Sequence, residues 1–158
     1  MHRLRVYVDT SVFGGVQDEE FAEASRLLLA RAARGKYLLL VSTLALEEIS
    51  KAPPAVRDVL LGLPRGTVET LRIDRDVGEL AEAYLAAGVV GSASRVDATH
   101  VAAATIARAD VIVSWNFRHI VNVERIRGFN AVNLVNGFAP LDIRSPQELA
   151  YGNEDEEV

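Results

Sequence analysis

Short, uninterrupted hydrophobic runs alternate along the chain with longer stretches in which hydrophobic residues recur every three or four positions. The short runs are typical of strands buried on both faces, and the longer stretches are typical of amphipathic helices. The predicted strands are Leu4–Val8, Tyr37–Val41, Thr67–Ile73, Val111–Ser114 and Ala131–Val135. The predicted helices are Glu19–Arg34, Ser42 or Thr43 to Lys51, Ala55–Leu63, Asp74 or Asp76 to Ala87, Arg95–Arg108 and Ser145–Leu149. This alternation predicts an α/β fold with a central parallel sheet and helices on both faces.

The alternation continues without a linker, an internal repeat or a low-complexity tract that could separate two domains. A chain of 158 residues is also of the usual size for one domain with its own hydrophobic core. We therefore expect a single domain over residues 1–150, followed by a flexible acidic tail over residues 151–158. The tail contains the acidic run Glu154 to Glu157.

The formal net charge is −5, and because much of it lies in the acidic tail, the rest of the chain is nearly neutral. Binding of nucleic acid through bulk positive charge is therefore excluded. The absence of cysteine excludes disulfides, thiolate nucleophiles and cysteine-based metal sites. No apolar segment is long enough for a membrane span, and no signal peptide is visible. We expect a cytoplasmic protein that makes no contact with a membrane.

Several polar side chains follow directly after predicted strands or stand in the first turns of predicted helices. They are Asp9, Glu47, Glu48, Asp97 and Asn116. Taken singly, each has an ordinary explanation as a helix cap, a turn residue or compensation of the helix dipole. Because the carboxyl ends of parallel strands meet at one edge of a sheet, we expect these side chains to surround one cleft. Carboxylate and amide oxygens are ligands that Mg²⁺ and Mn²⁺ prefer, so the pattern predicts a metal site.

Four segments resemble, in order and spacing, the motifs of PIN-domain ribonucleases, and among these the VapC-type toxins of toxin–antitoxin pairs. The segments are Val8–Val12, Leu46–Ile49, Val96–Ala104 and Val113–Ile120, and the similarity extends over residues 4–135. It implies a single PIN-like domain and a metal-dependent endoribonuclease that hydrolyses RNA phosphodiester bonds with Mg²⁺ or Mn²⁺. It also implies a role as a toxin, a small antitoxin partner and a homodimer.

The resemblance assigns metal-binding and catalytic roles to Asp9, Glu48, Asp97 and Asn116. Glu48 is preferred to Glu47 because an aliphatic residue follows it and because adjacent helical side chains point about 100° apart, so that only one can face the cleft. Asn116 stands where the family commonly has a fourth acidic residue. We therefore expect a weakly bound second metal ion or a reduced activity.

Further residues near these motifs are candidates for substrate contacts, and they are Thr10, Ser11, Arg118 and His119. Thr10 and Ser11 are placed to donate hydrogen bonds to a phosphate or to a ligand carboxylate, with helix capping as the alternative for Ser11. Arg118 and His119 could contact RNA phosphates, and simple solvation is the alternative for Arg118. We expect His100 to be a partly buried structural residue, with a ligand contact as the alternative. Trp115 is predicted to pack against the core, with base stacking as the alternative.

Other α/β enzyme classes fit the sequence less well. No G-x-G-x-x-G fingerprint and no phosphate-binding P-loop follow the first strand. A receiver domain needs a lysine late in the sheet, and the two lysines are Lys36 and Lys51. A haloacid-dehalogenase-like phosphatase needs an aspartate two residues after Asp9, where Ser11 stands. The remaining alternative is a catalytically weak PIN-like module that binds RNA or protein, and Asn116 keeps it open.

Overall fold

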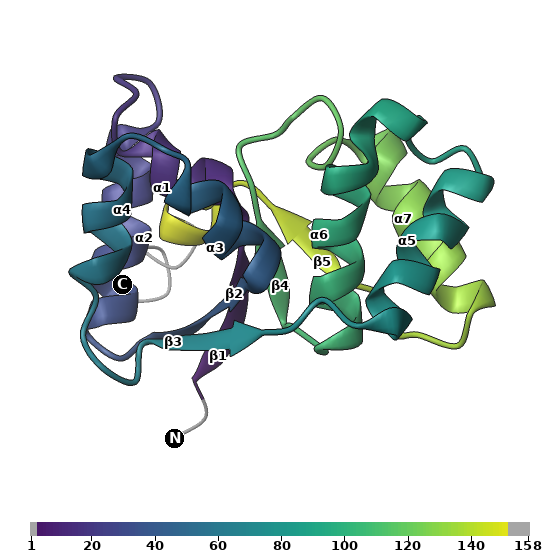
Figure 1. Cartoon of the computed structure of the whole chain (residues 1–158), viewed down its shortest axis with the longest axis horizontal. Helices are drawn as coiled ribbons and strands as arrows, with labels where there is room; N and C mark the ends of the chain where they lie inside the picture. Colours follow the sequence, from purple (N-terminus) through teal and green to yellow (C-terminus); the bar gives the residue numbers. More distant parts are fainter. Residues whose placement is uncertain (1–2, 152–158) are drawn as a thin grey trace.

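A computed structural model describes residues 3–151, which form a five-stranded, all-parallel sheet with helices on both faces (Figure 1). The strands are β1 (Leu4–Val8), β2 (Tyr37–Ser42), β3 (Val68–Leu71), β4 (Val111–Val113) and β5 (Asp142–Arg144). The helices are α1 (Thr10–Gly15), α2 (Ala22–Ala33), α3 (Thr43–Ser50), α4 (Pro54–Leu61), α5 (Arg75–Ala86), α6 (Arg95–Ile106), α7 (Val123–Val135), α8 (Pro146–Tyr151) and the 3-10 turn η1 (Ser92–Ser94). The strand order β3-β2-β1-β4-β5 places β1 at the centre. The predicted fold class is confirmed.

Side chains of the central strand β1 lie in two separate hydrophobic cores, one on each face of the sheet. Successive residues of a strand point to opposite faces. Val6 and Val8 therefore lie in the core covered by α1 to α4 and α8, and Tyr7 lies in the core covered by α5 to α7. All three side chains are fully buried. The alternation matters for function, because it directs the Tyr7 hydroxyl toward α6.

The predicted strand at residues 131–135 is wrong, because this segment is the last part of α7. Asn122 caps the helix by accepting a hydrogen bond from Arg125 N. Phe129 and Asn133, one helical turn apart, are both fully buried, and Asn133 Oδ1 accepts a hydrogen bond from Tyr84. The β-branched residues of the segment form a pattern typical of a strand, which explains the wrong prediction. The last strand of the structure is β5, which has a single buried residue, Ile143, between two charged ones.

Other elements also differ from the predictions in their presence or their bounds. The sequence analysis missed α1, and the helix predicted from Glu19 begins at Ala22. The predicted terminal helix is present as α8, and it includes Tyr151. The rest of the predicted acidic tail, residues 152–158, lies outside the described residues. Within residues 3–151, no helix combines the length and the hydrophobicity that crossing a membrane requires.

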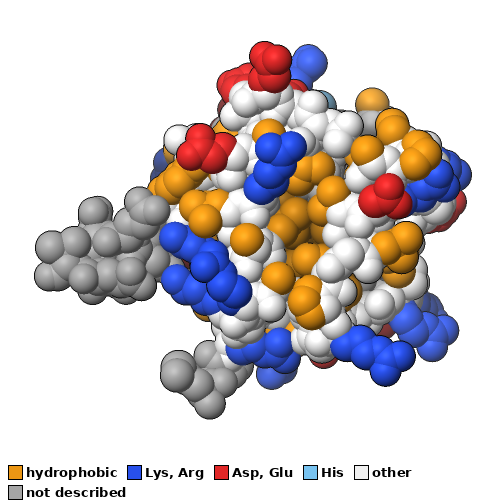
Figure 2. Space-filling view, turned by 90° about the vertical axis from the view of Figure 1, so that its left-hand side faces the viewer, with side chains coloured by type: hydrophobic (Ala, Val, Ile, Leu, Met, Phe, Trp, Pro, Cys, Tyr) orange, Lys and Arg blue, Asp and Glu red, His pale blue; other side chains and the backbone are white. Residues whose placement is uncertain are grey.

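Hydrophobic side chains also gather on the face of the molecule that carries α4, with lysine and arginine side chains around them (Figure 2). Leu61, at the end of α4, is among the most exposed large hydrophobic residues of the chain. Val59 and Leu60 from the same helix are only partly buried. This face therefore presents an apolar band with a basic border.

Substituting Gly15 with alanine is expected to destabilise the fold by about 1–3 kcal/mol, the usual range for overpacking. A Cβ atom there would lie 2.6 Å from Ser25 Oγ and 2.8 Å from Trp115 Nε1, two atoms that form a hydrogen bond with each other. Gly14→Ala is the matched control, since a Cβ on Gly14 meets nothing within 4 Å. Urea unfolding followed by circular dichroism measures both. Equal stability of the two variants would contradict the packing described here.

Candidate active site

The structure brings four predicted site residues together at the carboxyl ends of β1 and β4. Asp9 directly follows β1, and Asn116 lies in the loop that leads from β4 to α7 (Figure 1). Glu48 comes from α3 and Asp97 from the first turn of α6. His100 links Asp9 to Glu48, and His119 contacts Asp97 and Asn116. Ser114 Oγ joins the two pairs, because it donates to Asp9 and accepts a hydrogen bond from Asn116 N. Residues far apart in sequence therefore share one polar cluster at one edge of the sheet.

Asp9 is held by two serine hydroxyls and is only 6% exposed. Its Oδ2 accepts hydrogen bonds from Ser114 Oγ at 2.6 Å and from Ser11 Oγ at 2.9 Å. Although Asp9 is the N-cap residue of α1, its side chain makes no capping hydrogen bond. Its carboxylate is therefore directed to the cluster, and the capping explanation for Asp9 does not apply. Ser11 orients the carboxylate and also accepts a hydrogen bond from Trp115 N.

Glu48 is oriented by one histidine and one threonine. Its Oε1 lies 2.7 Å from His100 Nε2 and 2.9 Å from Thr10 Oγ1, which donates a hydrogen bond to it. The hydrogen bond from His100 lowers the pKa of Glu48, and it outweighs the opposing effect of burial. Glu47 is exposed and pairs instead with Lys51 on the same helix. The choice of Glu48 as the residue that faces the cleft therefore agrees with the geometry.

His100 is the central residue that the sequence analysis did not place at the site. It is 1% exposed, its Nδ1 lies 2.7 Å from Tyr7 Oη, and its Nε2 also lies 3.5 Å from Asp9 Oδ1. Tyr7 Oη donates to Ser42 Oγ at 2.8 Å, and Ser42 caps α3, the helix that carries Glu48. His100 is therefore structural and in contact with the candidate ligands at once. The sequence feature that indicates this position is the spacing of three residues between Asp97 and His100, which places the two side chains on neighbouring faces of one helix.

The pKa of His100 is raised despite its burial. Burial alone acts to lower the pKa of a histidine, but the hydrogen bond to Glu48 and the negative charges of Asp9, Glu48 and Asp97 outweigh it. Burial also raises the pKa of Tyr7, which keeps its hydroxyl protonated. The imidazole ring thus adds positive character to the centre of a cluster of carboxylates.

Asn116 and His119 together hold Asp97. Asn116 Nδ2 donates to Asp97 Oδ1 at 3.0 Å, and Asn116 Oδ1 accepts from His119 N at 2.9 Å. Only the amide nitrogen can face a carboxylate favourably, so this orientation follows from the chemistry of the pair. His119 Nδ1 lies 3.3 Å from Asp97 Oδ2. In this arrangement Asn116 orients Asp97, and its carbonyl oxygen is already engaged. Its predicted role as a metal ligand stays a prediction.

The pKa of Asp97 is raised, first by burial and then by the negative charge of Asp9. His119, His100 and the hydrogen bond from Asn116 act in the opposite direction. Two carboxylates are therefore close enough to disfavour each other's ionised form. A bound cation would relieve this repulsion, and carboxylate oxygens are the donors that hard divalent cations prefer.

The donor chemistry of the cluster thus fits a divalent metal ion, and Asp9, Glu48 and Asp97 are the residues that would hold it. As the side chains stand, no group of three or more histidine, aspartate or glutamate side chains within residues 3–151 is arranged to hold a metal ion. The hydrogen bonds described above engage Glu48 Oε1 and both oxygens of Asp97. Metal binding would therefore exchange some of these contacts for ligand bonds.

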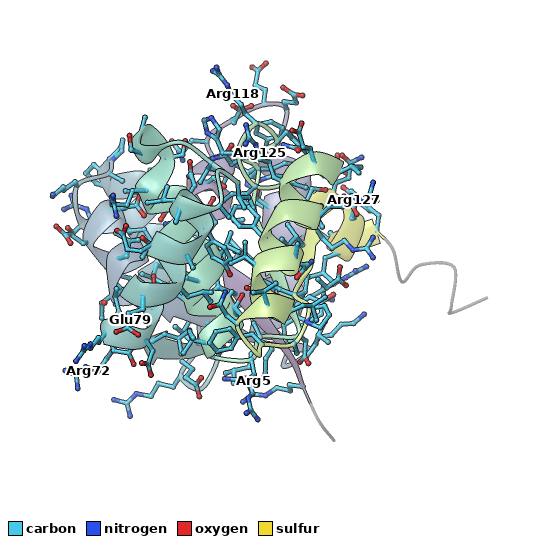
Figure 3. The ribbon with its side chains drawn as sticks, turned by 90° about the vertical axis from the view of Figure 1, so that its right-hand side faces the viewer. Arg5, Arg72, Glu79, Arg118, Arg125 and Arg127 are labelled. Carbon is cyan, nitrogen blue, oxygen red and sulfur yellow. The ribbon has the colours of Figure 1, made fainter. Side chains whose placement is uncertain are left out.

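Arg118, predicted to contact substrate phosphates, is exposed at the same end of the molecule as the cluster. Figure 3 shows Arg118, Arg125 and Arg127 at this end, whereas Arg5 and Arg72 lie at the opposite end. The loop that carries Arg118 is braced by Asn122, whose Nδ2 donates to the carbonyl oxygens of Phe117 and Arg118. Arg118 and Arg127 are exposed, whereas Arg125 is half-buried and donates a hydrogen bond to the carbonyl oxygen of Val89.

Sequence comparison finds no family model that matches the chain and no match among curated proteins. Structure comparison finds the crystal structure of VapBC2 from Rickettsia felis bound to a DNA fragment from their promoter, with a TM-score of 0.55 and 14% sequence identity. The similarity covers 90% of this chain and 98% of the other. The chain has a VapC-type, PIN-like fold. The fold expected from the sequence motifs is therefore confirmed at an identity too low for sequence comparison to detect.

Proposed function

We propose that this chain is a metal-dependent endoribonuclease that hydrolyses RNA phosphodiester bonds and acts as the toxin of a toxin–antitoxin pair. The observation that carries the proposal is the convergence of Asp9, Glu48 and Asp97 at the carboxyl edge of the sheet, with hydrogen-bond partners that orient each carboxylate. The similarity in fold to VapBC2 supports the same assignment. The exposed guanidinium groups of Arg118 and Arg127 suit a polyanionic substrate (Figure 3).

In this proposal the chain's own residues position the reacting groups. Asp9 and Asp97 would hold Mg²⁺ or Mn²⁺, and Glu48 would act as a further ligand or orient a water molecule. A bound divalent cation supplies a water molecule of lowered pKa and stabilises negative charge on the scissile phosphate. Ser114 fixes the direction of the Asp9 carboxylate, and His100 fixes that of Glu48. These contacts hold the carboxylates in one cluster before substrate arrives.

Glu48→Gln is expected to reduce metal-dependent cleavage by about 100-fold or more, because it removes the charge that His100 and Thr10 hold in place. Glu47→Gln is the matched control, since it changes the neighbouring residue in the same way on the exposed face of α3. Purified protein is incubated with structured and single-stranded RNAs, with Mn²⁺ or with EDTA. Equal activity of the two variants, or cleavage indifferent to EDTA, would contradict the proposal.

The same assay separates the proposal from its alternative, a PIN-like module that binds RNA or protein without cutting. Retained RNA binding together with no cleavage across the whole RNA panel would favour that module. As partners we propose a small antitoxin and a second copy of the chain. The apolar band with a basic border on the face of α4 is one surface on which a protein partner could bury apolar area (Figure 2).

A further inference from the structure

A half-exposed aromatic ring stands next to the carboxylate cluster and has no part in the chemistry proposed above. Phe117 follows Asn116 directly and is 48% exposed, although it belongs to a group of three aromatic side chains. Its ring centroid lies 6.1 Å from that of Trp115, edge to face, and 6.4 Å from that of Phe21. One part of the ring is therefore packed, and the rest faces the solvent.

The two rings beneath Phe117 are themselves fixed. Phe21 and Trp115 stack with a centroid distance of 4.2 Å and an interplanar angle of 18°. Trp115 Nε1 donates to the buried Ser25 Oγ at 2.8 Å, and Asn122 holds the carbonyl oxygen of Phe117. Phe117 is thus an exposed ring on an ordered support. A ligand that stacks on it would lose little free energy to ordering the side chain.

The ring of Phe117 lies near the carboxylates of the proposed active site. Adjacent Cα atoms are about 3.8 Å apart, and Asn116 is itself hydrogen-bonded to Asp97. Phe117 is therefore within the span of a few nucleotides of the carboxylates. Arg118 follows it in sequence, and Arg125 and Arg127 lie at the same end of the molecule (Figure 3).

We propose that Phe117 is a stacking platform for an unpaired base of single-stranded RNA, with Arg118 on a neighbouring phosphate. The inference rests on the proposed nuclease function and assigns a base-binding residue to that site. Stacking on aromatic rings is tolerant of base identity, because every base has a flat face. Bases inside a duplex are covered on both faces, so the platform selects single-stranded segments.

Charge favours a polyanion that approaches from one side. The loop before Phe21 carries three exposed acidic residues, Asp18, Glu19 and Glu20. Their negative charges repel phosphates, whereas the exposed Arg118 and Arg127, which follow Phe117 in sequence, attract them. We therefore expect the backbone of a bound strand to run from Phe117 toward α7, which carries Arg127.

The test measures binding in EDTA, so that no cleavage is required. A short single-stranded oligoribonucleotide and its duplex are titrated into the protein, and the fluorescence of Trp115, the only tryptophan of the chain, is followed beside the anisotropy of labelled RNA. We expect tighter binding of the single strand and a change in Trp115 emission. Phe117→Ala is expected to weaken single-strand binding by about 5- to 100-fold, the range for one stacked base, and Phe117→Trp, followed by anisotropy alone, to preserve it.

Val123→Ala is the matched control, because Val123 is another exposed apolar residue at this end of the molecule and lies outside the aromatic group. It should bind RNA as the unchanged protein does, and thermal unfolding verifies that every variant is folded. Unchanged single-strand binding by Phe117→Ala, or an equal loss for single strand and duplex, overturns the platform. Binding through Phe117 without cleavage in Mn²⁺ contradicts the nuclease proposal alone, and cleavage with an unchanged KM in Phe117→Ala contradicts the platform alone.

Discussion

Asp9→Asn is expected to reduce RNA cleavage by about 1,000-fold or more while the protein remains folded. Asp9 is the most buried of the three carboxylates, and loss of its charge removes several kcal/mol of metal binding and charge stabilisation. The fold tolerates the change because the hydroxyls of Ser11 and Ser114 can rotate to suit an amide as well as a carboxylate. Cleavage rates in Mn²⁺ and thermal unfolding measure the two effects separately.

The same variant has a second, independent signature at Asp97. Because the negative charge of Asp9 is one of the two causes that raise the pKa of Asp97, removing it should lower that pKa toward its ordinary value. NMR titration of the Asp97 carboxyl group measures this shift without metal or substrate. Asp142→Asn is the matched control, since Asp142 is exposed in β5 and pairs with Arg144. An Asp9→Asn protein with full cleavage activity, or with an unchanged Asp97 titration, would contradict the described cluster.

Removing the ring of His100 is expected to damage the site without removing a carboxylate. His100→Gln should lower Mn²⁺ affinity and cleavage by about 10- to 100-fold, the usual effect of losing a residue that orients a metal ligand. The physical reason is that His100 Nε2 fixes Glu48 Oε1 and lies beside Asp9. Isothermal titration with Mn²⁺ gives the affinity, and steady-state kinetics gives kcat and KM.

The pH dependence of stability supplies a further readout for His100. Its pKa is raised in the folded protein above the ordinary 6.5, so the stability it contributes is complete below about pH 6.5 and is lost as the pH rises through the raised value. Metal-free protein should therefore lose unfolding free energy over this window, and His100→Gln should not. Glu48 acts on the acid side of the pH range. Because its pKa is lowered in the folded protein, it contributes stability above pH 4.5, the ordinary pKa of glutamate, and this contribution is lost as the pH falls further.

Two tyrosines provide a matched pair for the same test. Tyr7→Phe removes the hydroxyl that links His100 to Ser42, and it should reproduce part of the His100→Gln effect on metal affinity. Tyr84→Phe removes an equally buried hydroxyl that contacts Thr105 and Asn133 in the α5 to α7 core. Both changes cost stability of the same kind, but only Tyr7→Phe should alter Mn²⁺ binding. Equal metal affinity in the two variants would contradict a role of the Tyr7 hydroxyl in positioning His100.

The sequence was sufficient for the fold class and for the residues at the ends of β1 and β4. Strands buried on both faces are visible in sequence as uninterrupted apolar runs, and the end of such a strand locates Asp9. His100 could not be placed in the same way, because its partners Tyr7 and Glu48 come from two other elements. That contact exists only because α6 covers the face of β1 to which Tyr7 points.

Local patterns failed where tertiary contacts decide the structure. Residues 131–135 contain β-branched and apolar residues in a strand-like run, yet they are helical because Asn122 caps α7 and Asn133 pairs with Tyr84. The short strand β5 presents one buried residue, which is too little for a periodicity to be recognised. In the site itself, the sequence identified Asn116 but not its orientation, which depends on the backbone of His119.

The order of the strands also decides when the site can exist during synthesis. Asp9 receives a hydrogen bond from Ser114 across 105 positions of the chain, and β1 must pair with β4 as well as with β2. Until β4 has been synthesised, β1 can pair only with β2. Asp97 and Asn116 join Asp9 late in translation, so the cluster is completed only when most of the sequence has emerged from the ribosome.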